Sequence, residues 1–346
     1  MIKVLVADDS AFMRQTFKKT IDYDPELTVI ATARNGRDAL RKIKKLKPDI
    51  ITLDVEMPKK DGIQTLKQIK DNYDDLPVIM ISAVDNKKTV MKALELGAFD
   101  FIPKPSGNIS LDIEEIKEQI INKIKAASNI KTVPLSEAKD QQSTTAGQPP
   151  VSPAQKDYSL IAIGTSSGGP RALKYFIKQL PKNFPAALVI VQHMPEGFTA
   201  SLARHLNQEA AFPIKEAEEG DEVQPGKGLL APGNYHLEIN KHGKIELNQK
   251  KKKWGVRPCI DYMMTSAARV FQEHVIGVIL TGMGHDGARG MEEIKKFNGY
   301  GIVESRETAL VYGMPSSTIK KEAYDTILPL DKIPKTLIQL LKGDKI

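Results

Sequence analysis

Only one cysteine, Cys259, occurs in the 346 residues, so the chain cannot form an internal disulfide. The absence of disulfides is typical of a reducing compartment, and we expect a cytoplasmic protein. Long apolar runs are also missing, because the longest, such as 186–191 and 275–280, are far shorter than the roughly 20 residues that cross a bilayer. The first residues, MIKVLVADDS, lack the apolar block of a secretory signal. We therefore expect neither export nor membrane insertion.

Dense basic clusters are scarce as well, although the formal net charge is +7. A nucleic-acid-binding protein would gather its lysines and arginines on one reading element. Only the run QKKKKWGVR at 249–257, which contains Lys250–Lys253, is densely basic. We interpret this run as a solvated loop or a strand edge protected by lysines. The alternative is a weak docking surface for an acidic partner, and no nucleic-acid partner is expected.

The composition, with 41% apolar and 27% charged residues, is that of a soluble globular protein. The chain is long enough for two domains. From residue 1 to about 125, five apolar runs alternate with stretches of helical spacing. This alternation predicts a parallel sheet with helices on both faces, a flavodoxin-like (βα)5 fold. The expected strands are 4–7, 29–31, 50–53, 78–81 and 99–102.

Residues 126–157 interrupt this alternation. They are rich in Ser, Thr, Gln and Pro and contain no aromatic residue, so they cannot bury enough surface to offset the entropy of ordering them, and we predict a flexible linker. A second alternation begins at residue 158, with the hairpin insertion YHLEINKHGKIELN. It predicts a doubly wound, mostly parallel α/β domain over 158–346. The expected strands are 160–164, 187–192, 275–281 and 300–304.

Four charged residues follow strands of the first domain: Asp8, Asp9, Asp54 and Lys104. Because the carboxyl ends of parallel strands share one edge of the sheet, we expect these side chains to line one crevice. Three carboxylates there require a cation, and oxygen ligands favour Mg²⁺. With Lys104 and the hydroxyl of Ser82, the crevice suits transfer of a phosphoryl group onto a carboxylate. The alternative for any one of the acidic residues is a helix cap.

The second domain opens with a glycine-rich turn, GTSSG at 164–168. It fits G-x-S-x-G, in which a strained serine projects from the end of a strand. The motif alone leaves close helix packing or phosphate binding open. The dinucleotide pattern fails because Ser166 replaces its second glycine, and the lysine of a phosphate-binding loop is missing.

Two further loops supply partners for Ser166. His193 follows the strand 187–192, and Asp286 follows the strand 275–281, so all three residues are expected where parallel strands open into loops. A serine nucleophile needs a base with a pKa near neutrality, and the imidazolium that forms needs a carboxylate to orient it. A structural histidine and a helix-capping aspartate are the alternatives. The remaining histidines lack metal-ligand spacing, so we expect no cofactor for this step.

The segments VLVADDSAFMR, ITLDVEMPKKDG, MISA and FDFIPKP resemble the receiver domain of two-component response regulators, over residues 1 to about 125. The resemblance implies that Asp54 accepts a phosphoryl group and that a sensor histidine kinase donates it. It also implies an Mg²⁺ site formed by Asp8, Asp9, Asp54 and the backbone of Glu56. The implied phosphoryl switch consists of Ser82, Phe101 and Lys104, with Phe101 where many receivers have tyrosine.

The segments IAIGTSSGGP, VQHMPEGF, APGNYHL, RPCIDYMM and ILTGMGHDGARG resemble the catalytic domain of chemotaxis protein-glutamate methylesterases. The resemblance implies a phosphorylation-activated serine esterase that hydrolyses glutamyl methyl esters on chemoreceptors, releases methanol, and in some members deamidates glutamines. Ser166 would be the nucleophile, His193 the base and Asp286 the orienting carboxylate. The backbone N–H groups near Ser167 and Met283 are the candidate oxyanion donors.

Two other functions stay open from the residues alone. The second domain could be a non-catalytic binding module of a response regulator, or a serine hydrolase or amidase with another substrate, since a triad sets the reaction and not the substrate. If the chain is an activated esterase, we expect its unphosphorylated receiver to cover the Ser166 crevice and phosphorylation of Asp54 to release it.

Overall fold

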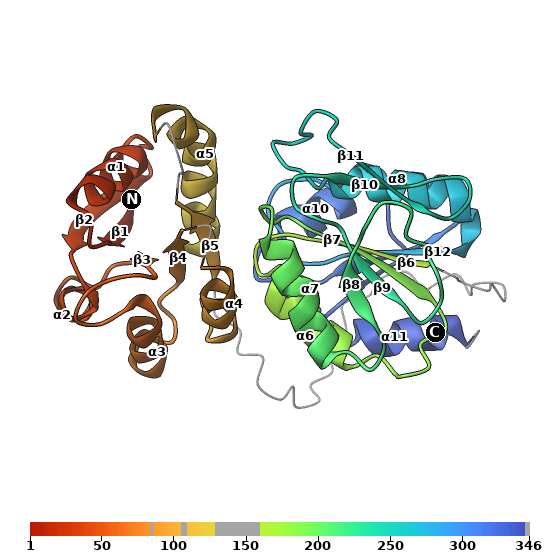
Figure 1. Ribbon diagram of the computed structural model, residues 1–346, viewed down its shortest axis with the longest axis horizontal. Helices are drawn as coiled ribbons and strands as arrows, with labels where there is room; N and C mark the ends of the chain where they lie inside the picture. Colours follow the sequence, from red (N-terminus) through yellow and green to blue (C-terminus); the bar gives the residue numbers. More distant parts are fainter. Residues whose placement is uncertain (84–85, 105–108, 129–159, 343–346) are drawn as a thin grey trace. The chain divides into compact units, whose positions relative to one another are not determined.

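The structure is a computed structural model that describes residues 1–83, 86–104, 109–128 and 160–342. Its contacts divide the chain into two units, Met1–Thr132 and Val133–Ile346 (Figure 1). The predicted linker, 126–157, lies outside the described residues from 129 onward, and its first three residues complete a helix. The boundary between linker and domains therefore stays a prediction.

The first unit contains one parallel sheet of five strands in the order β2-β1-β3-β4-β5. This is the flavodoxin-like order, so the predicted fold class is confirmed. The strands are β1 (Ile2–Ala7), β2 (Leu27–Ala33), β3 (Ile50–Asp54), β4 (Val78–Ser82) and β5 (Asp100–Pro103). The helices are α1 (Ala11–Asp22), α2 (Gly36–Leu46), α3 (Gly62–Asn72), α4 (Lys87–Glu95) and α5 (Ile109–Ser128).

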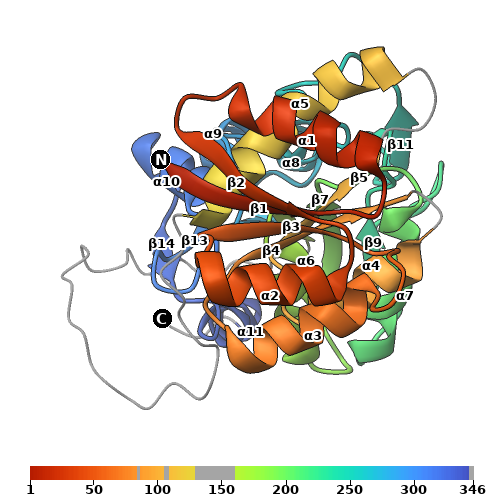
Figure 2. The same cartoon turned by 90° about the vertical axis from the view of Figure 1, so that its left-hand side faces the viewer.

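The sequence of the first unit explains why these elements form. Every residue of β3 and β4 is buried, as expected for strands that helices cover on both faces. Helices α1 and α5 lie on one face of the sheet, and α2, α3 and α4 lie on the other (Figure 2). Ser10, Asn35 and Asp61 cap the first three helices with their side chains. The carboxyl ends of the strands are thereby fixed at one edge.

The second unit contains a parallel sheet of seven strands in the order β14-β13-β12-β6-β7-β9-β8. The predicted hairpin is present as a separate antiparallel pair, β10–β11. The four predicted strands are also present, although the third ends at Ile279. The strands are β6 (Leu160–Thr165), β7 (Ala187–Gln192), β8 (Ile214–Glu216), β9 (Gly228–Leu230), β10 (His236–Ile239), β11 (Ile245–Asn248), β12 (Val275–Ile279), β13 (Tyr300–Glu304) and β14 (Thr326–Leu328).

Helices cover both faces of this second sheet (Figure 1). Buried methionines and alanines of α8 form much of the core between that helix and the sheet. The helices are α6 (Gly169–Lys178), α7 (Phe198–Glu209), α8 (Ile260–Phe271), the 3₁₀ helix η1 (Gln272–His274), α9 (Ala288–Lys296), α10 (Gly313–Lys320) and α11 (Ile333–Leu341). The chain leaves β6 toward β7 and later returns to β12 on the other side of β6. The strand order therefore reverses at β6, which is where α/β sheets place their ligands.

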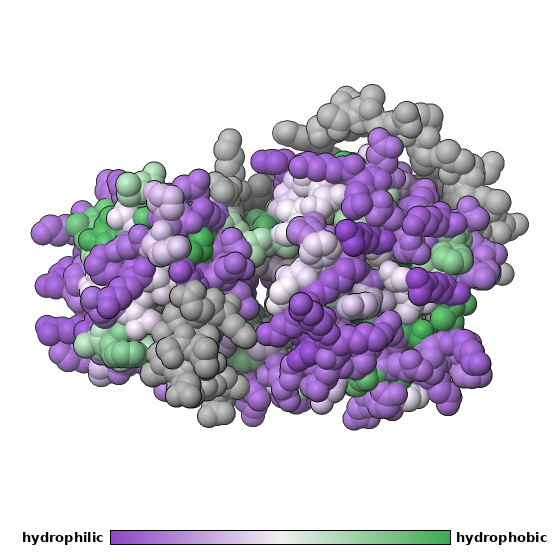
Figure 3. Space-filling view, turned by 90° about the horizontal axis from the view of Figure 1, so that it is seen from above, coloured by the Kyte–Doolittle hydropathy of each residue, from purple (hydrophilic) through white to green (hydrophobic). Residues whose placement is uncertain are grey.

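The visible surface is mostly hydrophilic, with apolar residues in small separate patches (Figure 3). The large apolar side chains that are exposed, such as Phe12 and Trp254, are scattered along the chain. None of the helices in the described ranges is long and apolar enough to cross a membrane.

Candidate active site

Ser166 lies in the turn between β6 and α6. Its backbone N–H donates to the carbonyl of Thr281 at 3.0 Å, and its own carbonyl accepts a hydrogen bond from Gln192 Nε2 at 2.9 Å. Gly168 follows at φ +81°, and a Cβ on Gly169 would lie 1.9 Å from Gln192 Oε1. Only glycine allows the chain to reverse this tightly against the neighbouring strand. The predicted strand–turn–helix around the serine is therefore present.

Strand register brings His193 beside Ser166. Thr165 pairs with Gln192 across β6 and β7, so Ser166 and His193 are the next residues on adjacent strands. The imidazole Nε2 of His193 lies 2.8 Å from Asp286 Oδ2, and both side chains are largely buried. Because Nε2 contacts the carboxylate, Nδ1 is the nitrogen that remains for Ser166. In the described part of the chain Ser166 Oγ has no hydrogen-bond partner, so its contact with His193 stays a prediction.

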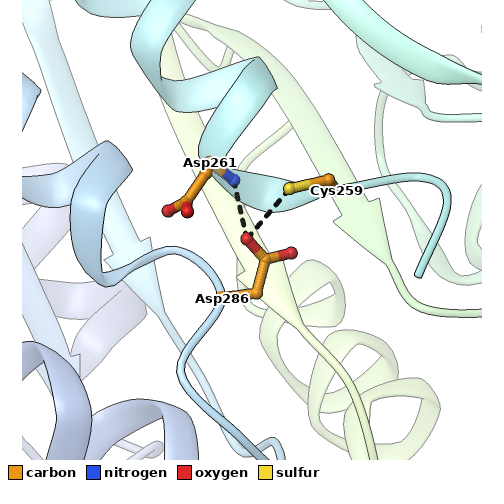
Figure 4. A group of neighbouring side chains, drawn as sticks. All are labelled: Cys259, Asp261 and Asp286. Atoms are coloured by element: carbon orange, nitrogen blue, oxygen red, sulfur yellow. Dashed lines mark hydrogen bonds between the residues drawn. The ribbon is translucent and has the colours of Figure 1, made fainter. Parts of the chain in front are cut away.

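Asp286 is fixed by the N-terminus of α8. Its carboxylate accepts the backbone N–H of Ile260 at 2.7 Å. It also accepts the backbone N–H of Asp261 at 3.0 Å and the thiol of Cys259 at 3.1 Å (Figure 4). The N-cap residue Cys259 makes no capping bond of its own. Burial raises the pKa of Asp286, but the hydrogen bonds from His193 and these backbone groups outweigh burial, and the pKa is lowered overall. Asp286 is thus held ionised against the imidazole.

Sequence analysis missed the role of Asp261. Its Oδ1 accepts the backbone N–H groups of Gly287 and Gly290, both at 2.9 Å, at the start of α9. Its Oδ2 accepts Trp254 Nε1 at 3.0 Å and pairs with Lys253 Nζ at 2.9 Å. Asp261 therefore caps α9 while Asp286 caps α8, and an aspartate near the start of a helix was the available signal.

Cys259, Asp261 and Asp286 place potential metal ligands within 4.8 Å of one another. The two carboxylates, however, already face hydrogen-bond donors from the backbone, an indole and an ammonium group. The thiol donates its own proton to Asp286, and burial raises the pKa of Cys259 far above its ordinary value. A thiol that keeps its proton is a poor metal ligand. This cluster fixes Asp286 against His193 and does not suit a metal ion.

The two candidate oxyanion donors belong to Ser167 and to Met283. Ser167 is the next residue, and its carbonyl accepts the hydroxyl of Thr281 at 2.9 Å. Met283 follows Gly282, where an added Cβ would be 3.0 Å from Ser166 Cβ. Among the described residues the Met283 N–H has no acceptor. A backbone donor that is unused so close to the serine can receive a developing oxyanion.

The basic run at 249–257 is a largely exposed loop, as predicted, and three of its side chains also make specific contacts. Lys250 pairs with Glu238, and Lys253 pairs with the buried Asp261. Arg257 Nη2 donates to Asn234 Oδ1 at 2.6 Å. These contacts fix the run to the second unit as an anchored loop beside α8.

The acidic crevice of the first unit is assembled as predicted at the carboxyl ends of β1, β3 and β5. Asp8, Asp9 and Asp54 bring carboxylate oxygens within 4.8 Å of one another. Lys104 Nζ lies 2.7 Å from Asp54 Oδ2 and 3.1 Å from Asp8 Oδ2. Burial, with the charge of Asp8, raises the pKa of Asp54 to about 6 against the opposing effect of Lys104. The crevice therefore holds closely spaced acidic groups with one lysine.

The crevice fits a divalent cation because its donor set is oxygen only. A cleft lined by Asp9, Glu56, Asp61 and Asn86 opens beside it. The Glu56 backbone N–H lies 3.3 Å from Asp54 Oδ1, and the Glu56 side chain accepts Asn86 Nδ2 at 2.9 Å. The backbone of Glu56 is thus near the acidic group, and its carbonyl as a metal ligand stays a prediction.

The three switch residues do not all meet at Asp54. Lys104 does, but the Ser82 hydroxyl donates to the carbonyl of Ala83 at 3.1 Å. Phe101 is 3% exposed, and Lys123 Nζ lies 5.5 Å from the centre of its ring. In this conformation Phe101 is buried and the Ser82 hydroxyl is hydrogen-bonded to the backbone next to it.

The first unit has the sheet order and acidic crevice of a receiver, and the second brings a serine, a histidine and an aspartate to the edge of an α/β sheet. Together they define the class of response regulators with an enzymatic output domain.

Comparison with known proteins identifies the family within this class. The family model described as CheB methylesterase matches residues 161–337, and the model described as response regulator receiver domain matches 4–116. The chain therefore belongs to the CheB methylesterase family and is a methylesterase with a receiver domain. Both resemblances found in the sequence are confirmed.

Similar proteins cover both units. A protein of Pyrococcus abyssi is 44% identical over 99% of this chain and 94% of its own length. A protein of Halalkalibacterium halodurans is 43% identical over 99% of both chains. Each is named protein-glutamate methylesterase/protein-glutamine glutaminase. The crystal structure of the Thermotoga maritima CheB methylesterase catalytic domain is 46% identical over 53% of this chain and 98% of that one, with a TM-score of 0.52.

Proposed function

We propose that this methylesterase hydrolyses glutamyl methyl esters on chemoreceptors and releases methanol, and that phosphorylation activates it. The contact of 2.8 Å between His193 and the anchored Asp286 carries the proposal, because the strand register places His193 level with Ser166. The names of the relatives supply the substrate class.

Ser166 Oγ attacks the ester carbonyl while His193 Nδ1 takes its proton. Asp286 stabilises the imidazolium through Nε2 and stays ionised. The backbone N–H groups of Ser167 and Met283 receive the oxyanion, each worth about 3–4 kcal/mol in comparable sites. His193 gives the proton to the departing methoxide, which leaves as methanol. In deacylation His193 takes a proton from water as the water oxygen attacks the acyl carbonyl, and then returns that proton to Ser166 Oγ, whose bond to the glutamyl carbonyl breaks.

The same nucleophile can act on an amide. The relatives' names include protein-glutamine glutaminase activity, and a glutamine side chain differs from the ester only in its leaving group. His193 would protonate departing ammonia in place of methanol. Deamidation of receptor glutamines is therefore the second proposed activity.

In the receiver domain, Asp54 would accept the phosphoryl group from a sensor histidine kinase. Asp8, Asp9, Asp54 and the carbonyl of Glu56 would hold Mg²⁺, which when bound supplies charge neutralisation for phosphoryl transfer. Lys104 is already within 2.7 Å of Asp54 and would pair with a phosphoryl oxygen. Ser82 would have to rotate from Ala83 to reach the same group.

The proposed domain organisation is a receiver over 1–125, a linker over 126–157 and a catalytic domain over 158–346. We propose that the unphosphorylated receiver occludes Ser166 and that the phosphorylated one does not. The cytoplasmic location expected from the sequence is part of the same proposal.

Replacement of the nucleophile tests the function. Ser166→Ala should abolish methanol release from methylated receptors, because alanine lacks the attacking oxygen. Phosphorylation of Asp54, followed with a radiolabelled donor, should be unchanged and shows that the receiver is intact, while thermal unfolding checks that the catalytic unit is folded. Full esterase activity in Ser166→Ala would exclude the proposed mechanism.

A further inference from the structure

One fully buried carboxylate lies close to Ser166 and has no place in the mechanism above. Glu304 ends β13 and is 0% exposed. Within the described ranges no lysine, arginine or histidine forms an ion pair with it. An unpaired carboxylate in a protein interior is costly and is retained where its hydrogen bonds have a use.

Two groups donate hydrogen bonds to the carboxylate of Glu304. The backbone N–H of Thr281 donates to Oε2 at 2.7 Å, and the hydroxyl of Thr308 donates to Oε1 at 2.9 Å. Thr308 Oγ1 in turn accepts the backbone N–H of Leu330 at 2.8 Å. Since β12 and β13 are neighbours in register, the carboxylate fixes the chain just past the end of β12.

Thr281 connects Glu304 to both sides of Ser166. Its carbonyl accepts the backbone N–H of Ser166 at 3.0 Å and the hydroxyl of Thr165 at 2.9 Å. Its hydroxyl donates to the carbonyl of Ser167 at 2.9 Å. The residues before, at and after the nucleophile thus all bond to Thr281.

The segment that follows Thr281 is equally close to the reaction. Gly282 packs against Ser166 Cβ, and Met283, a candidate oxyanion donor, comes next. A displacement of Thr281 would therefore move the nucleophile and one oxyanion donor together. Catalytic geometry is sensitive to shifts of this kind, since a displacement of about 1 Å can cost about a hundredfold in rate.

We propose that Glu304 is a positioning residue for the esterase, which holds Thr281 and, through it, the Ser166 turn. The inference rests on the proposed function because it assumes that Ser166 is the nucleophile. The role requires a hydrogen-bond acceptor at Oε2 and does not require a charge. Burial raises the pKa of Glu304 to about 7, which agrees with a carboxyl group whose protonated form can still accept the Thr281 N–H.

The test compares three variants of the full chain. Glu304→Ala should lower kcat about ten- to a hundredfold and leave KM within about twofold, because the residue is buried and touches no substrate. Glu304→Gln keeps an acceptor and should retain kcat within about threefold. Glu307→Ala, which changes an exposed glutamate of the same loop, is the matched control and should match the parent.

Folding is measured separately by thermal unfolding. If Glu304→Ala does not fold, Glu304→Met takes its place, because it fills a similar volume and offers only a weakly accepting sulfur instead of the carboxylate oxygens. Parent-like kcat in a folded Ala or Met variant would overturn the inference. A Gln variant as impaired as the Ala variant would overturn the role of the acceptor as well.

A second readout separates this inference from the proposed substrate. The rate at which a fluorophosphonate labels Ser166 reports the position of the nucleophile without a receptor. Slower labelling in Glu304→Ala supports the inference even if the parent releases no methanol from receptors. Equal labelling rates in the parent and Glu304→Ala would contradict it.

Discussion

Asp286 accepts hydrogen bonds from four groups besides His193: the thiol of Cys259 and the backbone N–H groups of Ile260, Asp261 and Gly287. Three of these donors are peptide groups that no side-chain substitution removes. Cys259 is the exception, so its contribution to the orientation of the carboxylate can be measured directly.

Cys259→Ala should weaken catalysis modestly. Loss of one hydrogen bond to a buried carboxylate is worth about 1 kcal/mol here because a thiol is a weak donor, which corresponds to about a fivefold fall in kcat. Cys259→Ser supplies a hydroxyl donor and should keep parent activity. Methanol release measures both variants, and a Ser variant as slow as the Ala variant would show that the thiol acts by packing alone.

Glu304 predicts a pH dependence of stability. Its pKa is raised from an ordinary 4.5 to about 7, so the folded state favours the protonated form. The stabilisation is complete below the unfolded pKa and is lost as pH rises through the folded pKa, on the order of 3 kcal/mol in total. Urea unfolding between pH 4 and pH 8 should show this loss in the parent, while Glu304→Gln, which cannot ionise, should lack it. Parallel curves for the two proteins would contradict the raised pKa.

At the scale of elements, α8 and α9 cap each other's N-termini. Asp286, which precedes α9, accepts the backbone N–H of Ile260 at the start of α8, and Asp261 of α8 accepts the N–H groups of Gly287 and Gly290 at the start of α9. The carboxylate proposed to orient His193 is therefore part of the junction between two helices. Asp261 also bonds the Trp254 indole through its other oxygen. The loop that carries Trp254 is thus hydrogen-bonded to Asp261, whose backbone N–H in turn donates to Asp286.

Asp261→Asn should separate the two roles of this side chain. The amide oxygen can still cap α9, but the amide nitrogen would face the Trp254 N–H and Lys253, two donors that it cannot accept from. Because Trp254 is the single tryptophan of the chain, its fluorescence reports the loop alone. We expect red-shifted emission and faster acrylamide quenching in Asp261→Asn.

The cap itself is measured by unfolding. Asp261→Ala should lose about 1–2 kcal/mol because α9 loses its capping acceptor, whereas Asp261→Asn should lose less. Unchanged emission in Asp261→Asn, or equal stability of the two variants, would show that the bonds to Asp261 do not hold these elements.

The secondary-structure elements differ in how well the sequence predicts them. The apolar strands such as Leu160–Thr165 and Ala187–Gln192 were predictable, because buried parallel strands are apolar throughout. The strands Ile214–Glu216, Gly228–Leu230 and Thr326–Leu328 were not, because three residues carry no periodicity. Ser166, His193 and Asp286 could be proposed as a triad because each follows a recognisable strand, and the structure brings His193 and Asp286 together.

The residues around the triad were not predictable in the same way. Cys259 lies 27 positions from Asp286, and Glu304 lies 23 positions from Thr281. Both contacts depend on which strands become neighbours, and a short apolar run does not specify its neighbour. The rotamer of Ser82 also depends on local packing that no motif encodes.

For the whole molecule, the expected regulation requires that phosphorylation of Asp54 change the activity of a separate unit. Inter-site coupling in proteins is typically 1–3 kcal/mol, about 5- to 150-fold. The segment 158–346 should therefore hydrolyse receptor methyl esters at least about fivefold faster than the unphosphorylated full chain. Ser166 and its partners all lie within this segment, so the catalytic residues themselves are unchanged by the truncation.

Phosphorylation should bring the full chain toward the same rate. With a small phosphoryl donor and Mg²⁺, the parent should be activated, and Asp54→Asn should stay at the unphosphorylated rate because it lacks the acceptor oxygen. Methanol release with and without donor measures both proteins, and the segment 158–346 serves as the control that no donor should affect. A segment no faster than the full chain, together with a parent that does not respond to the donor, would exclude occlusion by the receiver. Activation of the parent without a faster segment would instead require that the phosphorylated receiver stimulate the catalytic unit directly, since a receiver that only blocks Ser166 cannot raise the rate above that of the unit alone.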